Sequence, residues 1–177
     1  NNDKIGVLFF SDRVEKFIPP AKGKAHILRI IRELLTLRPM GKRTNIGVGL
    51  EYFMRVVRKR CVAFLLSDFL DAHDYHRQLA MARRRHDVVA VQVYDQRMAE
   101  LPNVGLMKLE DAETGHLQYV DTASRRVRQA HADWWQQHCT RLDDRFNRTR
   151  VDHTRIATGS DYVKGLKGLF ARRTAAR

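Results

Sequence analysis

The stretch CVAFLLSDFLD, residues 61–71, decides the fold class of this chain. Its first six residues are all apolar, which is typical of a central strand in a parallel sheet, because both faces of such a strand are buried. We therefore predict a strand over residues 61–69. Asp68 stands where another buried aliphatic would be expected. A buried carboxylate is costly unless it is paired, hydrogen-bonded or bound to a cation.

The segments around this strand alternate between helix and strand patterns. Residues 44–59 predict a helix for which Thr44 is the N-cap candidate, and its early glycines, Gly47 and Gly49, indicate close approach to a neighbouring backbone. The strand is followed by a helix pattern and a second strand pattern, at 74–87 and 88–95. This order predicts an α/β fold with a Rossmann-like, mostly parallel sheet that is flanked by helices.

The outer segments complete this architecture. The amino-terminal part predicts two strands that form a hairpin, the second ended by Pro19 and Pro20, and then an amphipathic helix, at 4–10, 14–20 and 23–38. The carboxyl-terminal part predicts two short strands within 106–122, a long helix at 123–147, a short extended piece and a final helix. We expect residues 1–122 to form the α/β domain and residues 123–177 a helical extension packed on it.

Composition excludes several classes of protein. With 177 residues and 44% hydrophobic residues, the chain is long and apolar enough for a globular domain with a real core. No apolar segment approaches the roughly 20 residues that span a bilayer. Two cysteines far apart in sequence, Cys61 and Cys139, argue against a disulfide framework. We expect a cytoplasmic protein, or the cytoplasmic part of a longer protein that is itself membrane-associated.

The chain is strongly basic, with a net charge of +13. Residues 123–177 hold 13 Lys or Arg against 5 Asp or Glu. A solvated basic face on the terminal helices is the simplest interpretation, and an acidic protein partner or nucleic acid are the alternatives. The sequence lacks the basic motifs with interleaved aromatic residues that RNA and single-strand binders carry, which argues against nucleic acid.

Three acids, Asp12, Asp68 and Asp95, lie at or just beyond predicted strand ends, where open α/β sheets bind ligands. Thr44 begins a predicted helix and could converge with Asp68 on one Mg²⁺ or Mn²⁺ site, because hydroxyl and carboxylate oxygens suit these ions. The alternatives are a turn-forming role for Asp68 and a plain N-cap for Thr44. A metal-dependent phosphoryl hydrolase that uses Asp68, Asp71 and Asp95 is a further alternative.

Four phrases in order, FSDRVE (10–15), IPPAKG (18–23), SDFLD (67–71) and ELPNVG (100–105), closely resemble the bacterial domain of unknown function 58 family. The resemblance covers residues 1–122 in detail and the terminal helices more loosely. It implies a von Willebrand factor A-like protein that works with a MoxR-type AAA+ ATPase in protein–protein interaction and is not an enzyme. It also implies a metal-ion-dependent adhesion site in which Thr44 and Asp68 are two of the ligands.

The resemblance also implies a first central strand and a D-x-S-x-S loop, and neither is present in this sequence. We therefore expect the chain to be the carboxyl-terminal part of a longer protein, with Mg²⁺ held tightly only in that protein. Thr44 and Asp68 alone are too few ligands for a tight site. Without the first strand, an edge beside residues 61–69 is left open, and we expect the chain to self-associate through such edges.

Overall fold

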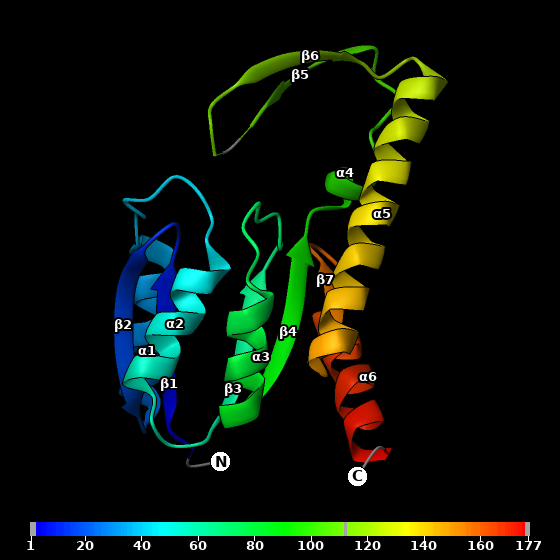
Figure 1. Ribbon diagram of the computed structural model, residues 1–177. Helices are drawn as coiled ribbons and strands as arrows, with labels where there is room; N and C mark the ends of the chain where they lie inside the picture. The colour runs from blue at the N-terminus through cyan, green and yellow to red at the C-terminus, as the bar shows by residue number, and fades with distance from the viewer. Residues whose placement is uncertain (1–2, 112, 176–177) are drawn as a thin grey trace. The chain divides into compact units, whose positions relative to one another are not determined.

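The computed structural model describes residues 3–111 and 113–175 (Figure 1). The chain forms two compact units. The first comprises the residues up to Lys59 together with Asp71–Gln78, and the second comprises Arg60–Leu70 and the residues from Leu79 onward. The boundary that we predicted at residue 122 stays a prediction.

The first unit is built on an antiparallel hairpin of β1 (Ile5–Phe10) and β2 (Val14–Ala21), which confirms the predicted hairpin. β2 was predicted over residues 14–20 and runs one residue further, through both prolines to Ala21. This is tolerated because β2 is the free edge of a two-stranded sheet, where a missing N–H interrupts no ladder.

Two helices accompany the hairpin, α1 (Lys24–Thr36) and α2 (Ile46–Val56). Gly49 of α2 faces the ring of Phe10, and a Cβ at this position would lie 2.8 Å from that ring. Gly49 therefore lies close to a neighbouring segment, as predicted, but the neighbour is the Phe10 side chain and not a backbone. The predicted apolar stripe of α1 exists but has no buried residue, and four of its members are 42–78% exposed: Ile27, Ile31, Leu34 and Leu35.

The second unit contains a three-stranded parallel sheet in the order β3-β4-β7, with β3 (Val62–Ser67), β4 (Asp87–Tyr94) and β7 (Asp152–Ala157). The α/β class with a parallel sheet flanked by helices is therefore as predicted. The extended piece predicted near the carboxyl end proves to be the third strand of this sheet. The unit also holds the short helix α4 (Gln96–Ala99) and the antiparallel hairpin of β5 (Leu106–Glu110) and β6 (Leu117–Asp121).

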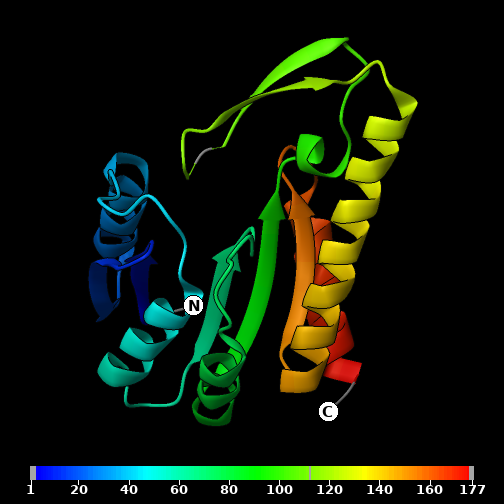
Figure 2. The same cartoon turned by 45° about the horizontal axis from the view of Figure 1, so that its top comes forward.

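Helices cover the two faces of this sheet unequally (Figure 2). One face packs on the long helix α5 (Arg125–Thr149), whose predicted stripe of Trp135, Cys139, Leu142 and Phe146 is buried. On the other face, α6 (Tyr162–Ala175) places Leu169 in a cluster with Val89 and Val91 of β4. The helix α3 (His76–Arg85) contributes the buried residues Leu79 and Ala82.

The outer strand β3 is less well covered than β4. Its residues Val62, Phe64 and Leu66 share a face with Val89 and Val91, because these residues are in register, and they remain 56%, 45% and 61% exposed. Phe64 meets Phe170 of α6 in an edge-to-face ring contact at 6.3 Å. Parallel sheets are normally covered on both faces, so this row of three apolar side chains is unusual for the fold.

In the described part of the chain, no helix has both the length and the apolar character needed to cross a membrane.

Candidate functional site

Asp68 forms the turn that follows β3 at the carboxyl end of the parallel sheet. Its Oδ1 accepts the backbone N–H of Leu70 at 3.1 Å and the hydroxyl of Ser67 at 3.4 Å. The Ser67 hydroxyl in turn accepts the N–H of Phe69 at 3.0 Å. Asp68 therefore has the turn-forming role that the sequence left open as an alternative, and this role occupies one of its two carboxylate oxygens.

The turn is tightened by Phe69, which adopts a left-handed backbone conformation with φ of 60°. This conformation is rare for a bulky residue and costs about 1 kcal/mol or more. The Phe69 ring is 1% exposed and meets the ring of Phe146 edge-to-face at 5.1 Å. Burial of this ring against α5 offsets the strain and holds Asp68 in place.

The backbone carbonyl of Asp68 is anchored as well. Gln92 of β4 is 2% exposed and donates from Nε2 to this carbonyl at 3.1 Å. His138 of α5 lies close to the same residue: burial lowers the pKa of His138, Arg141 acts in the same direction, and Asp68 opposes them. His138 is therefore neutral at pH 7, and its Nε2 is buried with no hydrogen-bond partner among the described residues.

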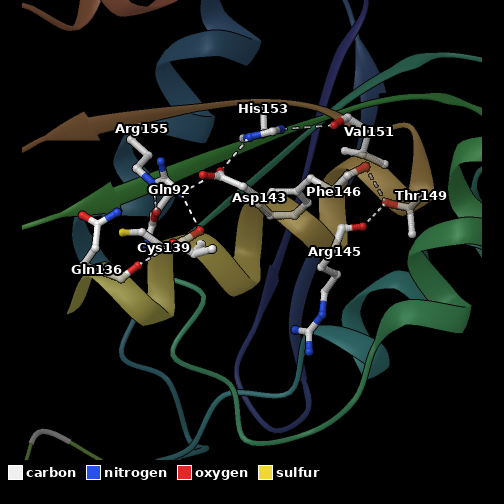
Figure 3. A network of polar contacts seen from close by, with 11 residues as sticks. Gln92, Gln136, Cys139, Asp143, Arg145, Phe146, Thr149, Val151, His153 and Arg155 are labelled. Carbon is white, nitrogen blue, oxygen red and sulfur yellow. Dashed lines mark hydrogen bonds and ion pairs between the residues drawn. The ribbon is translucent and has the colours of Figure 1, made fainter. Parts of the chain in front are cut away.

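A polar chain continues from Gln92 through the face that packs on α5 (Figure 3). Arg155 of β7 donates from Nε to Gln92 Oε1 at 2.9 Å and from the same guanidinium to Asp143 Oδ1 at 2.6 Å. Asp143 also contacts His153 Nε2 at 2.8 Å, and Arg155 reaches the carbonyl of Cys139 at 2.8 Å. This network connects all three strands to α5. It begins at the Asp68 carbonyl after β3, passes through Gln92 of β4 and Arg155 of β7, and ends on Asp143 and the Cys139 carbonyl of α5.

Thr44 lies in the first unit, whereas Asp68 lies in the second. Thr44 is half-buried and is not the N-cap, which corrects the prediction by one position. Asn45 is the N-cap and accepts the N–H of Val48 at 3.1 Å. Asp71 satisfies the next free donor, the N–H of Ile46, at 2.7 Å, so the helix start has no need of the Thr44 hydroxyl.

The other acids have local roles too. Asp71, whose side chain is fully buried, also accepts from the N–H and ring Nδ1 of His73, each at 2.8 Å. Asp95 caps α4 by accepting the N–H of Arg97 at 2.8 Å, and its other oxygen accepts the hydroxyl of Thr158 at 3.3 Å. Asp12 lies 3.2 Å from the guanidinium of Arg13.

The loop that contains Thr44 is held by Glu15, a residue that the sequence reasoning missed. Glu15 accepts the hydroxyl of Ser11 at 2.5 Å and the N–H groups of Gly41 at 2.9 Å and Met40 at 3.1 Å. These hydrogen bonds, led by that of Ser11, lower the pKa of Glu15. Glu15 is therefore ionised at neutral pH and orders the segment before α2.

The donors do not make a divalent-cation site within the described residues. No group of three or more His, Cys, Asp or Glu side chains is placed to hold a metal there. Around Asp68, its Oδ1 and the Ser67 hydroxyl are already bonded to each other and to the turn. Mg²⁺ needs near-octahedral oxygen coordination, so these residues do not hold it by themselves, and the roles of Thr44 and Asp68 in a larger site stay a prediction.

The comparison with protein families matches residues 1–141 to the model described as protein of unknown function DUF58. The chain belongs to the DUF58 family. This confirms the resemblance seen in its four sequence phrases. The DUF58 match extends beyond the first unit into the long helix α5, so it includes the strand end that carries Asp68.

Relatives of this DUF58 chain occur in mycobacteria. It is 33% identical to an uncharacterized protein of Mycobacterium bovis over 115 residues, which are 64% of this chain and 36% of the relative. An uncharacterized protein of Mycobacterium avium is 34% identical over 100 residues, 55% of this chain and 59% of that protein. The alignments thus span between about a third and three fifths of these relatives.

Among solved structures, the crystal structure of the conserved hypothetical protein BatB from Bacteroides thetaiotaomicron is similar in fold. It aligns with a TM-score of 0.56 at 14% identity and covers 99% of this chain and 81% of that chain. At this identity the likeness concerns the fold alone, and it agrees with the α/β architecture found here.

The sequence contained one usable signal for the polar network. Gln92 interrupts the apolar strand VVAVQVYD in the same way that Asp68 interrupts its own strand. A buried amide in a central strand requires partners for both its donor and its acceptor. The partners themselves, Asp68 and Arg155, lie 24 and 63 positions away and had no local signature.

Proposed function

We propose that this DUF58 chain is a non-enzymatic protein-interaction module of the von Willebrand A-like kind. The observation that carries the proposal is the row formed by Val62, Phe64 and Leu66 on β3, whose side chains remain 45–61% exposed. An exposed apolar row along an edge strand, with free backbone donors and acceptors beside it, favours contact with another polypeptide.

The roles of the carboxylates support an interaction module over a hydrolase. Asp68, Asp71 and Asp95 each accept backbone N–H groups in turns or at helix starts. A metal-dependent hydrolase needs carboxylates that converge and remain free for an ion and its water. The contact proposed for β3 does not depend on a metal.

We propose a MoxR-type AAA+ ATPase, or a client of such an ATPase, as the partner. This partner class follows from the family resemblance and is not identified by a residue of this chain. A cytoplasmic setting, for the chain alone or as part of a longer protein, belongs to the same proposal. It is supported by the two cysteines, Cys61 and Cys139, which are both free thiols.

The test measures binding of a purified MoxR-type ATPase by biolayer interferometry to the native chain and to Leu66→Lys. Leu66 is 61% exposed, so the substitution is expected to leave the fold intact while it places a charge in the apolar row. Loss of a well-desolvated apolar anchor weakens binding by about tenfold or more. Leu106→Lys is the matched control, because Leu106 is 70% exposed on β5 of the same unit.

The same pair of variants tests self-association. We expect the native chain and Leu106→Lys to form dimers or larger species in sedimentation velocity, and Leu66→Lys to shift toward monomer. Equal binding of the ATPase by all three proteins would remove the β3 row from the proposal. Mn²⁺-dependent phosphate release from generic esters, abolished by Asp68→Asn, would instead establish the hydrolase alternative.

A further inference from the structure

The amino-terminal end of the parallel sheet, opposite the end that carries Asp68, borders a cavity of about 620 Å³ within the second unit. Two acids and five arginines line it. The acids, Asp87 and Asp152, begin β4 and β7. The arginines are Arg60, Arg83, Arg150, Arg172 and Arg173. A second cavity of about 400 Å³ shares Asp152, Arg172 and Arg173 with it.

The chain topology explains why so many arginines converge here. In a parallel sheet with crossover helices, the helices run back so that they end where the next strand begins. Arg83 lies in the last turn of α3, Arg150 is the C-cap of α5, and Arg172 and Arg173 lie in the last turn of α6. Basic residues are favoured at helix carboxyl ends, but this preference alone does not gather several ends around one recess.

The acids of the cavity do not neutralise it, because both are paired with the same arginine. Arg173 makes ion pairs with Asp87 and, at 3.2 Å from its Nε, with Asp152. Arg83 donates its Nε to the backbone carbonyl of Arg150 at 2.8 Å, which fixes its guanidinium without neutralising it. Five arginines against two aspartates leave an excess of three positive charges on the lining.

Three of the guanidinium groups remain open to a ligand. Arg60, Arg150 and Arg172 are exposed residues, and none of them forms an ion pair with a residue in the described ranges. Like charges that line one recess repel each other, and an anion bound between them relieves that repulsion.

We propose that this cavity binds a chain of phosphate groups. Guanidinium groups are planar forks that match phosphate oxygens with paired hydrogen bonds. A single carboxylate would leave most of the excess charge unbalanced, whereas a diphosphate or triphosphate carries enough negative charge to match it. The volume lies in the range typical of small-molecule sites, roughly 300–1,000 Å³, and is more than a triphosphate needs. The ligand is therefore an inorganic polyphosphate or the phosphate tail of a nucleotide.

The test is isothermal titration of the full chain with inorganic triphosphate at fixed ionic strength, followed by the same titration with ATP. The main variant is Arg150→Gln with Arg172→Gln, which removes two open guanidiniums and leaves the Arg173 ion pairs in place. We expect it to bind triphosphate at least about tenfold more weakly than the native chain. Arg60→Gln provides an independent variant from another element, and we expect a loss in the same direction.

Arg126→Gln is the matched control, since Arg126 is exposed in the first turn of α5, at the far end from Arg150. We expect it to bind as the native chain does. Tighter binding of ATP than of triphosphate would identify a nucleotide as the source of the phosphates, and equal binding would identify the phosphate chain alone. The proposal is overturned if triphosphate does not bind, or if Arg126→Gln loses as much affinity as the double variant, because net charge alone would then explain the binding.

Discussion

The Gln92–Arg155 contact predicts a measurable loss of stability when Arg155 is replaced by leucine. The substitution leaves Gln92 Oε1, an acceptor on a side chain that is 2% exposed, without its donor at 2.9 Å. An unsatisfied buried acceptor costs about 1–3 kcal/mol. The ion pair with Asp143 adds little, because both side chains are about a third exposed, at 31% and 35%.

We therefore expect Arg155→Leu to lower the free energy of unfolding by about 1–3 kcal/mol. For a chain of this size that corresponds to a fall of about 2–12 °C in Tm. Thermal unfolding followed by circular dichroism measures the change. Arg148→Leu is the control: it makes the same substitution at an exposed arginine of α5, and we expect its Tm to stay close to that of the native chain.

A double-mutant cycle isolates the contact itself. Gln92→Leu alone leaves the Arg155 guanidinium with an unused donor, whereas the double variant Gln92→Leu with Arg155→Leu removes both partners. Residues that share a hydrogen-bond network show coupling of about 0.5–3 kcal/mol. The double variant should therefore lose less stability than the two single variants together. Strict additivity, or an unchanged Tm in Arg155→Leu, would refute the assignment of this network as a link between the strands and α5.

Three further predictions concern Gly49, Asp71 and Glu15 of the first unit, and Gly168 of the second unit serves as a control for Gly49. Gly49→Ala should destabilise the protein by about 1–3 kcal/mol in urea unfolding, because its Cβ would lie 2.8 Å from the Phe10 ring. Gly168→Ala, a helical glycine of α6 with its nearest atom at 3.7 Å, should instead be neutral or stabilising. Asp71→Ala should cost about 1–3 kcal/mol by the same measurement, since it leaves the N–H of Ile46 without its acceptor; an unchanged midpoint would contradict the capping role. Glu15→Gln should lower Tm at neutral pH, where the carboxylate with its lowered pKa is ionised and stabilises the fold. The difference from the native chain should shrink as the pH falls below the ordinary glutamate value and through the folded pKa, and a difference that is constant with pH would argue against it.

The sequence by itself determined the elements and their class. The apolar run that ends at Leu66 predicted β3, and the stripe from Trp135 to Phe146 predicted the buried face of α5. These features follow from periodicity and local composition, which a single stretch of chain expresses without its neighbours. Family membership could be recognised for the same reason, because its phrases are contiguous.

The roles of the polar residues were decided only by the tertiary structure. Thr44 and Asn45 are both good N-caps by type, and the choice of Asn45 depends on Asp71, which reaches Ile46 from 25 positions away. Whether Asp68 forms a turn or binds an ion depends in the same way on which donors surround it. A hydrogen bond is short and directional, so its partners are known only when distant segments meet.

The arginines show the same division between sequence and structure. The sequence showed that the last third of the chain is basic, and the simplest interpretation was a solvated helix face. The parallel sheet brings the ends of α3, α5 and α6 to the ends of the strands, and so gathers five arginines from four separate segments around one cavity. Charge is a property of composition and can be counted from the sequence. Charge convergence is a property of topology, because only the packing of helices on the sheet decides which charges come within a few ångströms of one another.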